Sequence, residues 1–115
     1  MSARVPGDAR ASERENPLGP PMVYIGSKPT MTYVFQVVTE LNSGTGPVLV
    51  KARGVAIAKA VDVAEVVRRR LLKDQVEIGS IVIDTERLVN RDGREANVSA
   101  ITIPMRRTAP VPPPS

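Results

Sequence analysis

Two short segments carry the side chains best suited to chemistry, and the chemistry that they suggest is the binding of phosphate groups. In Gly26-Ser27-Lys28-Pro29, a lysine lies at the junction between a strand-like segment and a helix-like one. A helix N-terminus presents free N–H groups and a partial positive charge, so anions bind there readily. In Lys51-Ala52-Arg53-Gly54, the alternation of a strand places both cations on one side, next to a glycine that lets a backbone approach closely. We expect a single cationic patch if both segments lie at the same edge of a sheet.

Each segment also has an ordinary structural explanation. The first lacks the further glycines and the Gly-Lys-Ser/Thr ending of a nucleotide-binding loop, so alone it fits a simple strand-to-helix connection. The second alone fits a charged strand end followed by a turn glycine. The convergence of Lys28, Lys51 and Arg53 is what favours a phosphate-binding surface.

Three more residues are candidates for contact with a nucleic acid. Tyr33 falls on the polar side of the helix-like segment, one turn from Lys28, where it can stack on a sugar, bond a phosphate or pack against a neighbouring loop. Arg91 and Arg94 flank Asp92-Gly93, and Asp-Gly between strand-like segments is a strong hairpin signal. Arginines on a projecting hairpin can enter the minor groove of DNA, where negative potential is focused. Charged tips also keep hairpins soluble, so the tip by itself only suggests binding.

The composition argues against catalysis. The 115-residue chain has no histidine and no cysteine, which removes the usual general base, the disulfides and the thiolate metal sites. Asp62 and Glu65 are explained by pairing on a helix surface, and Asp84 and Glu86 by a strand edge. We therefore expect no enzyme, no cofactor and no metal.

The net charge of +4 and the pI near 10.0 favour polyanionic partners. The sequence has no apolar stretch long enough to span a bilayer and no signal-peptide core. We expect a cytoplasmic protein without membrane contact.

The spacing of apolar residues predicts one α+β domain of order βαβαββ. Strands are expected at 22–25, 48–50, 76–87 and 95–105, and helices from Pro29 to Asn42-Ser43-Gly44 and over 57–71. Both helices are available to cover one face, which gives a two-layer sandwich with a mixed four-stranded sheet and a long C-terminal β-hairpin. The domain is expected to span residues 22–107. Residues 1–21 are expected to form a flexible tail, and the proline-rich residues 108–115 an extended one.

The same spacing assigns an inner face to each helix. In the first helix, the residues expected in the core are Met31, Val34, Phe35, Val38 and Leu41. In the second, they are Ile57, Ala60, Val61, Ala64, Val67 and Leu71. Val63 and Val66 then face outward, and exposed valines on a small protein predict a surface for self-association. The run Arg68-Arg69-Arg70 is not counted as a binding surface, because Glu65 is spaced to pair with its first two arginines.

Residues 22–107 resemble the Alba family of archaeal chromatin proteins. The resemblance is carried by Gly26-Ser27-Lys28-Pro29, Lys51-Ala52-Arg53-Gly54, the helix opening at residues 56–65 and Asn97-Val98-Ser99. It implies the βαβαββ fold, a homodimer, and binding of double-stranded DNA without marked sequence preference, and of RNA as well. The implied location is the chromosome, or nucleoid, in the cytoplasm. The residues that would form the binding surface and the hairpin arms are Ser27, Lys28, Tyr33, Lys51, Arg53, Gly54, Lys59, Arg91 and Arg94.

Two positions depart from the usual pattern of the family. Ser27 stands where the family often has the first of two adjacent lysines, the one associated with reversible acetylation, so that regulation does not transfer to this chain. Val55 stands where the family often has an arginine. Both changes lower the local charge, which leaves open weaker binding or a heterodimer with a more basic paralogue. The alternatives to DNA compaction are an RNA-binding protein or subunit of an RNA-processing ribonucleoprotein, and a protein scaffold that uses the proline-rich end.

Overall fold

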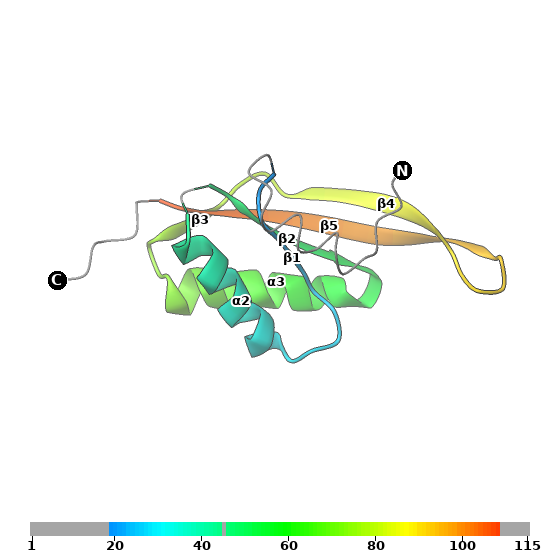
Figure 1. Cartoon of the computed structure of the whole chain (residues 1–115), viewed down its shortest axis with the longest axis horizontal. Helices are drawn as coiled ribbons and strands as arrows, with labels where there is room; N and C mark the ends of the chain where they lie inside the picture. The colour runs from blue at the N-terminus through cyan, green and yellow to red at the C-terminus, as the bar shows by residue number, and fades with distance from the viewer. Residues whose placement is uncertain (1–18, 45, 109–115) are drawn as a thin grey trace.

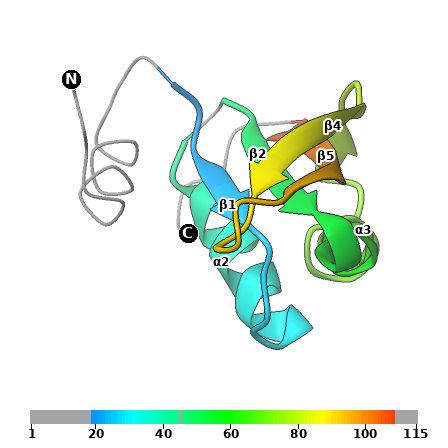
Figure 2. The ribbon, with the colours of Figure 1, turned by 90° about the vertical axis from the view of Figure 1, so that its right-hand side faces the viewer.

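The computed structural model describes residues 19–44 and 46–108, which form two layers (Figure 1). A sheet of five strands makes one layer, and the helices α2 (Thr30–Asn42) and α3 (Ile57–Val66) cover one face of it. The strands are β1 (Met22–Tyr24), β2 (Val48–Arg53), β3 (Val76–Ile78), β4 (Val82–Val89) and β5 (Glu95–Arg107). Figure 2, a view along the long axis, shows both helices beneath the sheet. The predicted α+β sandwich is confirmed, with its third strand divided in two.

The sheet is mixed, in the order β1-β2-β5-β3, with β4 also paired to β5. β1 runs parallel to β2, whereas β5 is antiparallel to β2, β3 and β4. β2 is therefore a central strand, as its apolar start predicts. Its pairing extends beyond both ends of β1, because the Leu49 N–H donates to the Pro21 carbonyl (2.9 Å) and the Ile25 N–H to the Lys51 carbonyl (2.8 Å).

A β-bulge divides the strand predicted over 76–87 into β3 and β4, so the sheet has five strands rather than four. Ile78 lies opposite Met105 and Val82 opposite Thr102, so three residues of one strand face two of β5. Pro104 of β5 lies at this point and has no N–H to donate across the sheet. The missing donor accounts for the break in the hydrogen-bond ladder.

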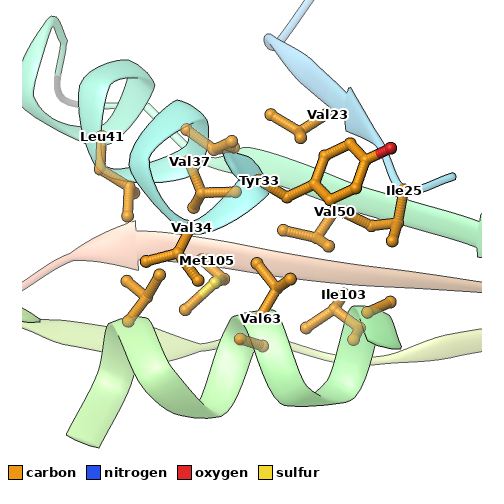
Figure 3. Close-up of a cluster of buried hydrophobic side chains, with 14 of the residues drawn as sticks. Val23, Ile25, Tyr33, Val34, Val37, Leu41, Val50, Val63, Ile103 and Met105 are labelled. Atoms are coloured by element: carbon orange, nitrogen blue, oxygen red, sulfur yellow. The ribbon is translucent and has the colours of Figure 1, made fainter. Parts of the chain in front are cut away.

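The core lies between the sheet and the helices, and valine is its most frequent residue (Figure 3). Val34, Val50, Val63 and Met105 are fully buried there. Burying one such side chain contributes about 1.5–3 kcal/mol to stability. Aliphatic packing thus holds the two layers together and fixes where the loops that follow β1 and β2 emerge.

The buried face of α2 differs from the predicted one. Tyr33 lies in the core and is 6% exposed, whereas Phe35 is 58% and Met31 43% exposed. The apolar pattern favours phenylalanine for the interior, but the Tyr33 hydroxyl reaches hydrogen-bond donors within the chain, which offsets the cost of burying it. The prediction that Tyr33 lies on the polar side of its helix is therefore wrong.

The face of α3 that packs on the sheet also differs from the predicted one. Val63 is fully buried and Val61 is 43% exposed, so the prediction that Val63 faces outward is wrong. Val66 is half-buried and packs against the core. Apolar residues occupy most positions from 57 to 67, so the helical period fits both faces equally well. Packing against the sheet, rather than the sequence period, selects between them.

A π-helical turn, η2 (Val67–Leu71), follows α3 and changes which leucine is buried. The Leu72 N–H donates to the Val67 carbonyl at 2.9 Å, a bond that spans five residues rather than four. The extra residue leaves Leu71 41% exposed and brings Leu72 into the core. The prediction of Leu71 as a core residue is wrong for this reason.

The arginines that open the basic run are paired on the helix surface, as their spacing predicts. Glu65 lies 2.7 Å from Arg68 and 2.9 Å from Arg69. The hydrogen bond from Arg68 holds the pKa of Glu65 below its ordinary value. Because that pKa is lowered in the folded state, the pairing stabilises the fold at neutral pH, and this contribution is lost as the pH falls through the lowered value.

The described chain ends where β5 is joined to the helical layer. Arg107 is 9% exposed and donates to the side chains of Asn42 (2.8 Å) and Gln75 (3.0 Å). Of the predicted tails, residues 1–18 and 109–115 lie outside the described residues. Across the described ranges, no helix has the length and apolar character needed to cross a membrane.

Candidate nucleic-acid interface

The parallel pairing of β1 and β2 brings the loops that follow these strands to the same edge of the sheet. Ser27 of the β1–α2 loop lies with Arg53, Gly54 and Lys59 around one hollow in the surface. The structure therefore brings together the two segments singled out in the sequence. The residues that we call the loop surface are Ser27, Lys28, Lys51, Arg53 and Gly54, and Lys59 of α3 lies beside them.

Two side chains from the helices bond the backbone of the β1–α2 loop. Tyr33 Oη accepts hydrogen bonds from the N–H groups of Gly26 (2.9 Å) and Lys28 (3.1 Å). Lys59 Nζ donates to the carbonyls of the same two residues, at 3.0 and 2.7 Å. These two N–H groups are thus already bonded within the protein and are not free to bind a phosphate. What the loop itself offers to a ligand is the exposed side chain of Lys28.

Lys51 and Arg53 lie on the face of the sheet that the helices leave open. Alternation along β2 buries Val48, Val50 and Ala52 against the helices and turns the cations the other way, so both cations lie on one side, as predicted. Gly54 follows with a φ of +57°, a left-handed conformation that strains other residues. It begins the short 3-10 helix η1 (Gly54–Ala56), which leads into α3. The glycine is therefore required by the turn that ends β2.

Two carboxylates share the open face with these cations. Asp84 and Glu86 of β4 line the same shallow hollow as Lys51 and Arg53. Glu86 Oε1 lies 3.1 Å from Arg53 Nη1, and the two side chains are 44% and 55% exposed, so water screens the pair. This ion pair was not predicted from the sequence. The signal that points to it is the hairpin register, which sets Glu86 opposite Val98 and within reach of β2 across β5.

The β4–β5 hairpin extends beyond the helices and carries Arg91 and Arg94 in its turn (Figure 1). Asn90 closes the turn, because its Oδ1 accepts the N–H groups of Asp92 and Arg94, both at 3.0 Å. Gly93 has a φ of +82°, as the predicted Asp-Gly hairpin turn requires. The turn is thus ordered by its own hydrogen bonds, and both arginines are exposed.

The cations of the loop surface and the neighbouring Lys59 differ in how far they are compensated. Arg53 is paired with Glu86, and the Lys59 ammonium is bonded to two carbonyls. Lys28 and Lys51, by contrast, have no ion pair or side-chain hydrogen bond with any residue that the structure describes. Among all the residues that the structure describes, there is no group of three or more acidic, histidine or cysteine side chains that could hold a metal ion.

Comparisons with known proteins identify relatives of this chain. The model of the Alba family matches residues 22–85. The DNA/RNA-binding protein Alba of Methanocella arvoryzae is 50% identical over 86 residues, which cover 75% of this chain and 88% of that protein. The structure of Alba from Thermoplasma volcanium is similar with a TM-score of 0.69 at 42% identity, covering 75% of this chain and 99% of the other. The structure of ALBA1 from Trypanosoma brucei is similar with a TM-score of 0.58 at 27% identity, covering 77% and 70%.

Since the family model spans more than half of the chain and a relative with 50% identity aligns with three quarters of it, this chain belongs to the Alba family.

Proposed function

We propose that this protein binds and compacts double-stranded DNA without regard to sequence, through the loop surface and the β4–β5 hairpin. The observation that carries the proposal is the convergence, at one edge of the sheet, of the loops that follow β1 and β2. Lys28, Lys51 and Arg53 supply cations there that reach the solvent. The 50% identity to a DNA/RNA-binding protein supports the same function.

Binding through these cations is electrostatic. Each phosphate that a lysine or arginine neutralises releases counterions, so the logarithm of the affinity falls linearly with the logarithm of the salt concentration, by about 0.9 per contact. Contacts to phosphates position a protein on a duplex but do not read its bases. The loop surface therefore gives affinity without sequence preference, which is what a protein that coats DNA requires.

The hairpin supplies the second part of the mechanism. Arg91 and Arg94 lie in an ordered turn beyond the helices, so they can reach past the backbone that the loop surface contacts. Arginine side chains are attracted into the minor groove by its focused negative potential. In this arrangement the loop surface of the two-layer domain lies on the phosphates, and the hairpin follows the minor groove. The proposed site of action is the chromosome in the cytoplasm.

We propose that the protein forms a dimer in which a second copy of this chain packs against α3 and β4. A dimer would present two loop surfaces and two hairpins to the DNA. Ile83 of β4 is 79% exposed and lines a shallow hollow together with Ile57 at the start of α3. Val61, one turn further along α3, is 43% exposed. Apolar side chains clustered at the surface of a small protein are typical of partner contacts. A more basic paralogue is the alternative occupant, since Ser27 and Val55 lower the charge of this chain.

RNA is the second candidate ligand, because the relative from Methanocella arvoryzae is named as a protein that binds RNA as well as DNA. The loop surface can hold an RNA backbone through the same phosphate contacts, as a subunit of an RNA-processing particle would. Tyr24 and Phe35 are exposed but come from different layers, so they form no platform for stacking successive unpaired bases. Affinities for duplex DNA, duplex RNA and structured RNA at one salt concentration discriminate between the two functions.

Replacing Lys51 and Arg53 together with alanine tests the loop surface. The double variant is expected to bind all duplexes more weakly at low salt, by at least about tenfold, because two charge-assisted contacts are lost. The slope of log affinity against log salt should flatten by about 1.8 per bound chain. Fluorescence anisotropy with labelled duplexes across a salt series measures both quantities.

The double variant Arg70→Ala/Lys73→Ala is the charge-matched control, since both exposed residues lie in or just after η2, at the end of α3 remote from the loop surface. An unchanged slope in the double variant, or an equal loss of affinity in the control, would contradict the role of the loop surface.

Glu86→Gln is expected to strengthen binding. The substitution removes the carboxylate that pairs with Arg53, and an exposed pair is weak, so the affinity for duplex DNA should rise by about two- to fivefold. Glu77→Gln on β3 removes the same charge without an ion pair in the described structure. Equal gains in the two variants would show that net charge, and not the release of Arg53, governs the affinity.

Ile83→Glu is expected to convert a dimer to a monomer, because it places a charge within the apolar cluster of α3 and β4. Sedimentation equilibrium of the free protein measures the change in mass. Phe35→Glu on α2 is the control, since it adds the same charge at another exposed apolar position and should leave the mass unchanged. A wild-type protein that sediments as a monomer would refute the proposed interface.

A further inference from the structure

The buried tyrosine of α2 has its hydroxyl fully engaged as an acceptor by the loop that carries Lys28. Figure 3 shows the Tyr33 ring in the core beside Val23, Val50 and Ile25, with its oxygen toward the chain that leaves β1. That oxygen accepts the N–H groups of Gly26 and Lys28, at 2.9 and 3.1 Å. The core is thus joined through one oxygen atom to both residues that flank Ser27.

Lys59 bonds the same two residues from the neighbouring helix. Its ammonium donates to the carbonyls of Gly26 (3.0 Å) and Lys28 (2.7 Å) and lies 6.0 Å from the centre of the Tyr33 ring. The two side chains therefore satisfy four backbone groups of one exposed loop, two donors and two acceptors. A surface lysine that serves only as a charge needs no such pair of carbonyls.

Gly26 shows how closely the loop and the tyrosine approach. A Cβ at this position would lie 3.2 Å from Tyr33 Oη, closer than most contacts of this kind. The close approach, and not an unusual backbone conformation, is what favours glycine here. The loop sequence and the tyrosine seven residues later thus form one structural unit.

We infer that Tyr33 and Lys59 are positioning residues, a clamp that holds the β1–α2 loop so that the Lys28 side chain is directed to a phosphate. The inference rests on the proposed function and assigns both residues a role other than direct contact with the nucleic acid. A loop that is already ordered in the free protein loses less conformational freedom on binding. The clamp therefore raises affinity through Lys28, and its effect disappears when Lys28 is absent.

Tyr33→Phe is the first test, because it removes the acceptor without changing the charge. In the free protein, amide hydrogen exchange at Gly26 and Lys28 should accelerate by about tenfold or more, while amides in β2 and β5 keep their protection. Affinity for duplex DNA should fall about three- to tenfold. In a Lys28→Ala background, the same substitution should have little further effect on affinity.

Lys59→Met is the second variant, and it separates positioning from contact. Added to Lys28→Ala, it should leave the salt slope of that variant unchanged, whereas a phosphate contact by Lys59 would flatten the slope by about 0.9 more. A Tyr33→Phe loss that persists in full without Lys28 would also overturn the inference, as would unchanged amide exchange in the free protein. If the wild-type protein binds no duplex, the proposed function fails and with it the role of the clamp in binding.

Discussion

The parallel pairing of β1 with β2 is the constraint on which the rest of the molecule depends. Two adjacent parallel strands end at the same edge of a sheet, so the loops that follow them emerge side by side. The connection between the strands must cross one face, and α2 does so over a core of valine side chains. α3 packs on the same face, which leaves the other face open for Lys51 and Arg53. Strand pairing and core packing thus determine where the cations lie.

The charge of the loop surface is moderated by groups that are also part of the fold. Arg53 is paired with Glu86, and the neighbouring Lys59 is bonded to two carbonyls. In the proposed interface, Lys28 and Lys51 are therefore the cations that would meet a phosphate without first giving up an ion pair or a side-chain hydrogen bond. An exposed ion pair contributes only about 0–1 kcal/mol, which a phosphate can readily replace. In the proposed interface, the carboxylates would therefore reduce affinity without blocking the surface. A chain with a net charge of +4 depends on such details more than a strongly basic one would.

Most of the elements were predictable from the sequence because they depend on local patterns: helical spacing, strand alternation and the Asp-Gly turn. The loop convergence was expected only on the condition that both loops lie at one edge of the sheet, which the parallel pairing of β1 and β2 fulfils. The errors arose where tertiary contacts decide between two allowed patterns. Tyr33 is buried because its hydroxyl finds two donors in a loop that no local pattern places beside it. Leu71 is exposed because a π-turn adds a residue to the helix. The Arg53–Glu86 pair depends on a register across three strands, which residue spacing along one strand does not reveal.

The central claim is that this chain binds duplex DNA through phosphate contacts made at the loop surface. Its most direct test is the affinity of the wild-type protein for two unrelated duplexes of equal length, measured by fluorescence anisotropy across a salt series. We expect equal affinities for both sequences and a linear log–log dependence with a slope of about −5, from Lys28, Lys51 and Arg53 in each chain of a dimer. Negligible binding at low salt, a slope near zero, or a strong preference for one sequence would contradict the claim.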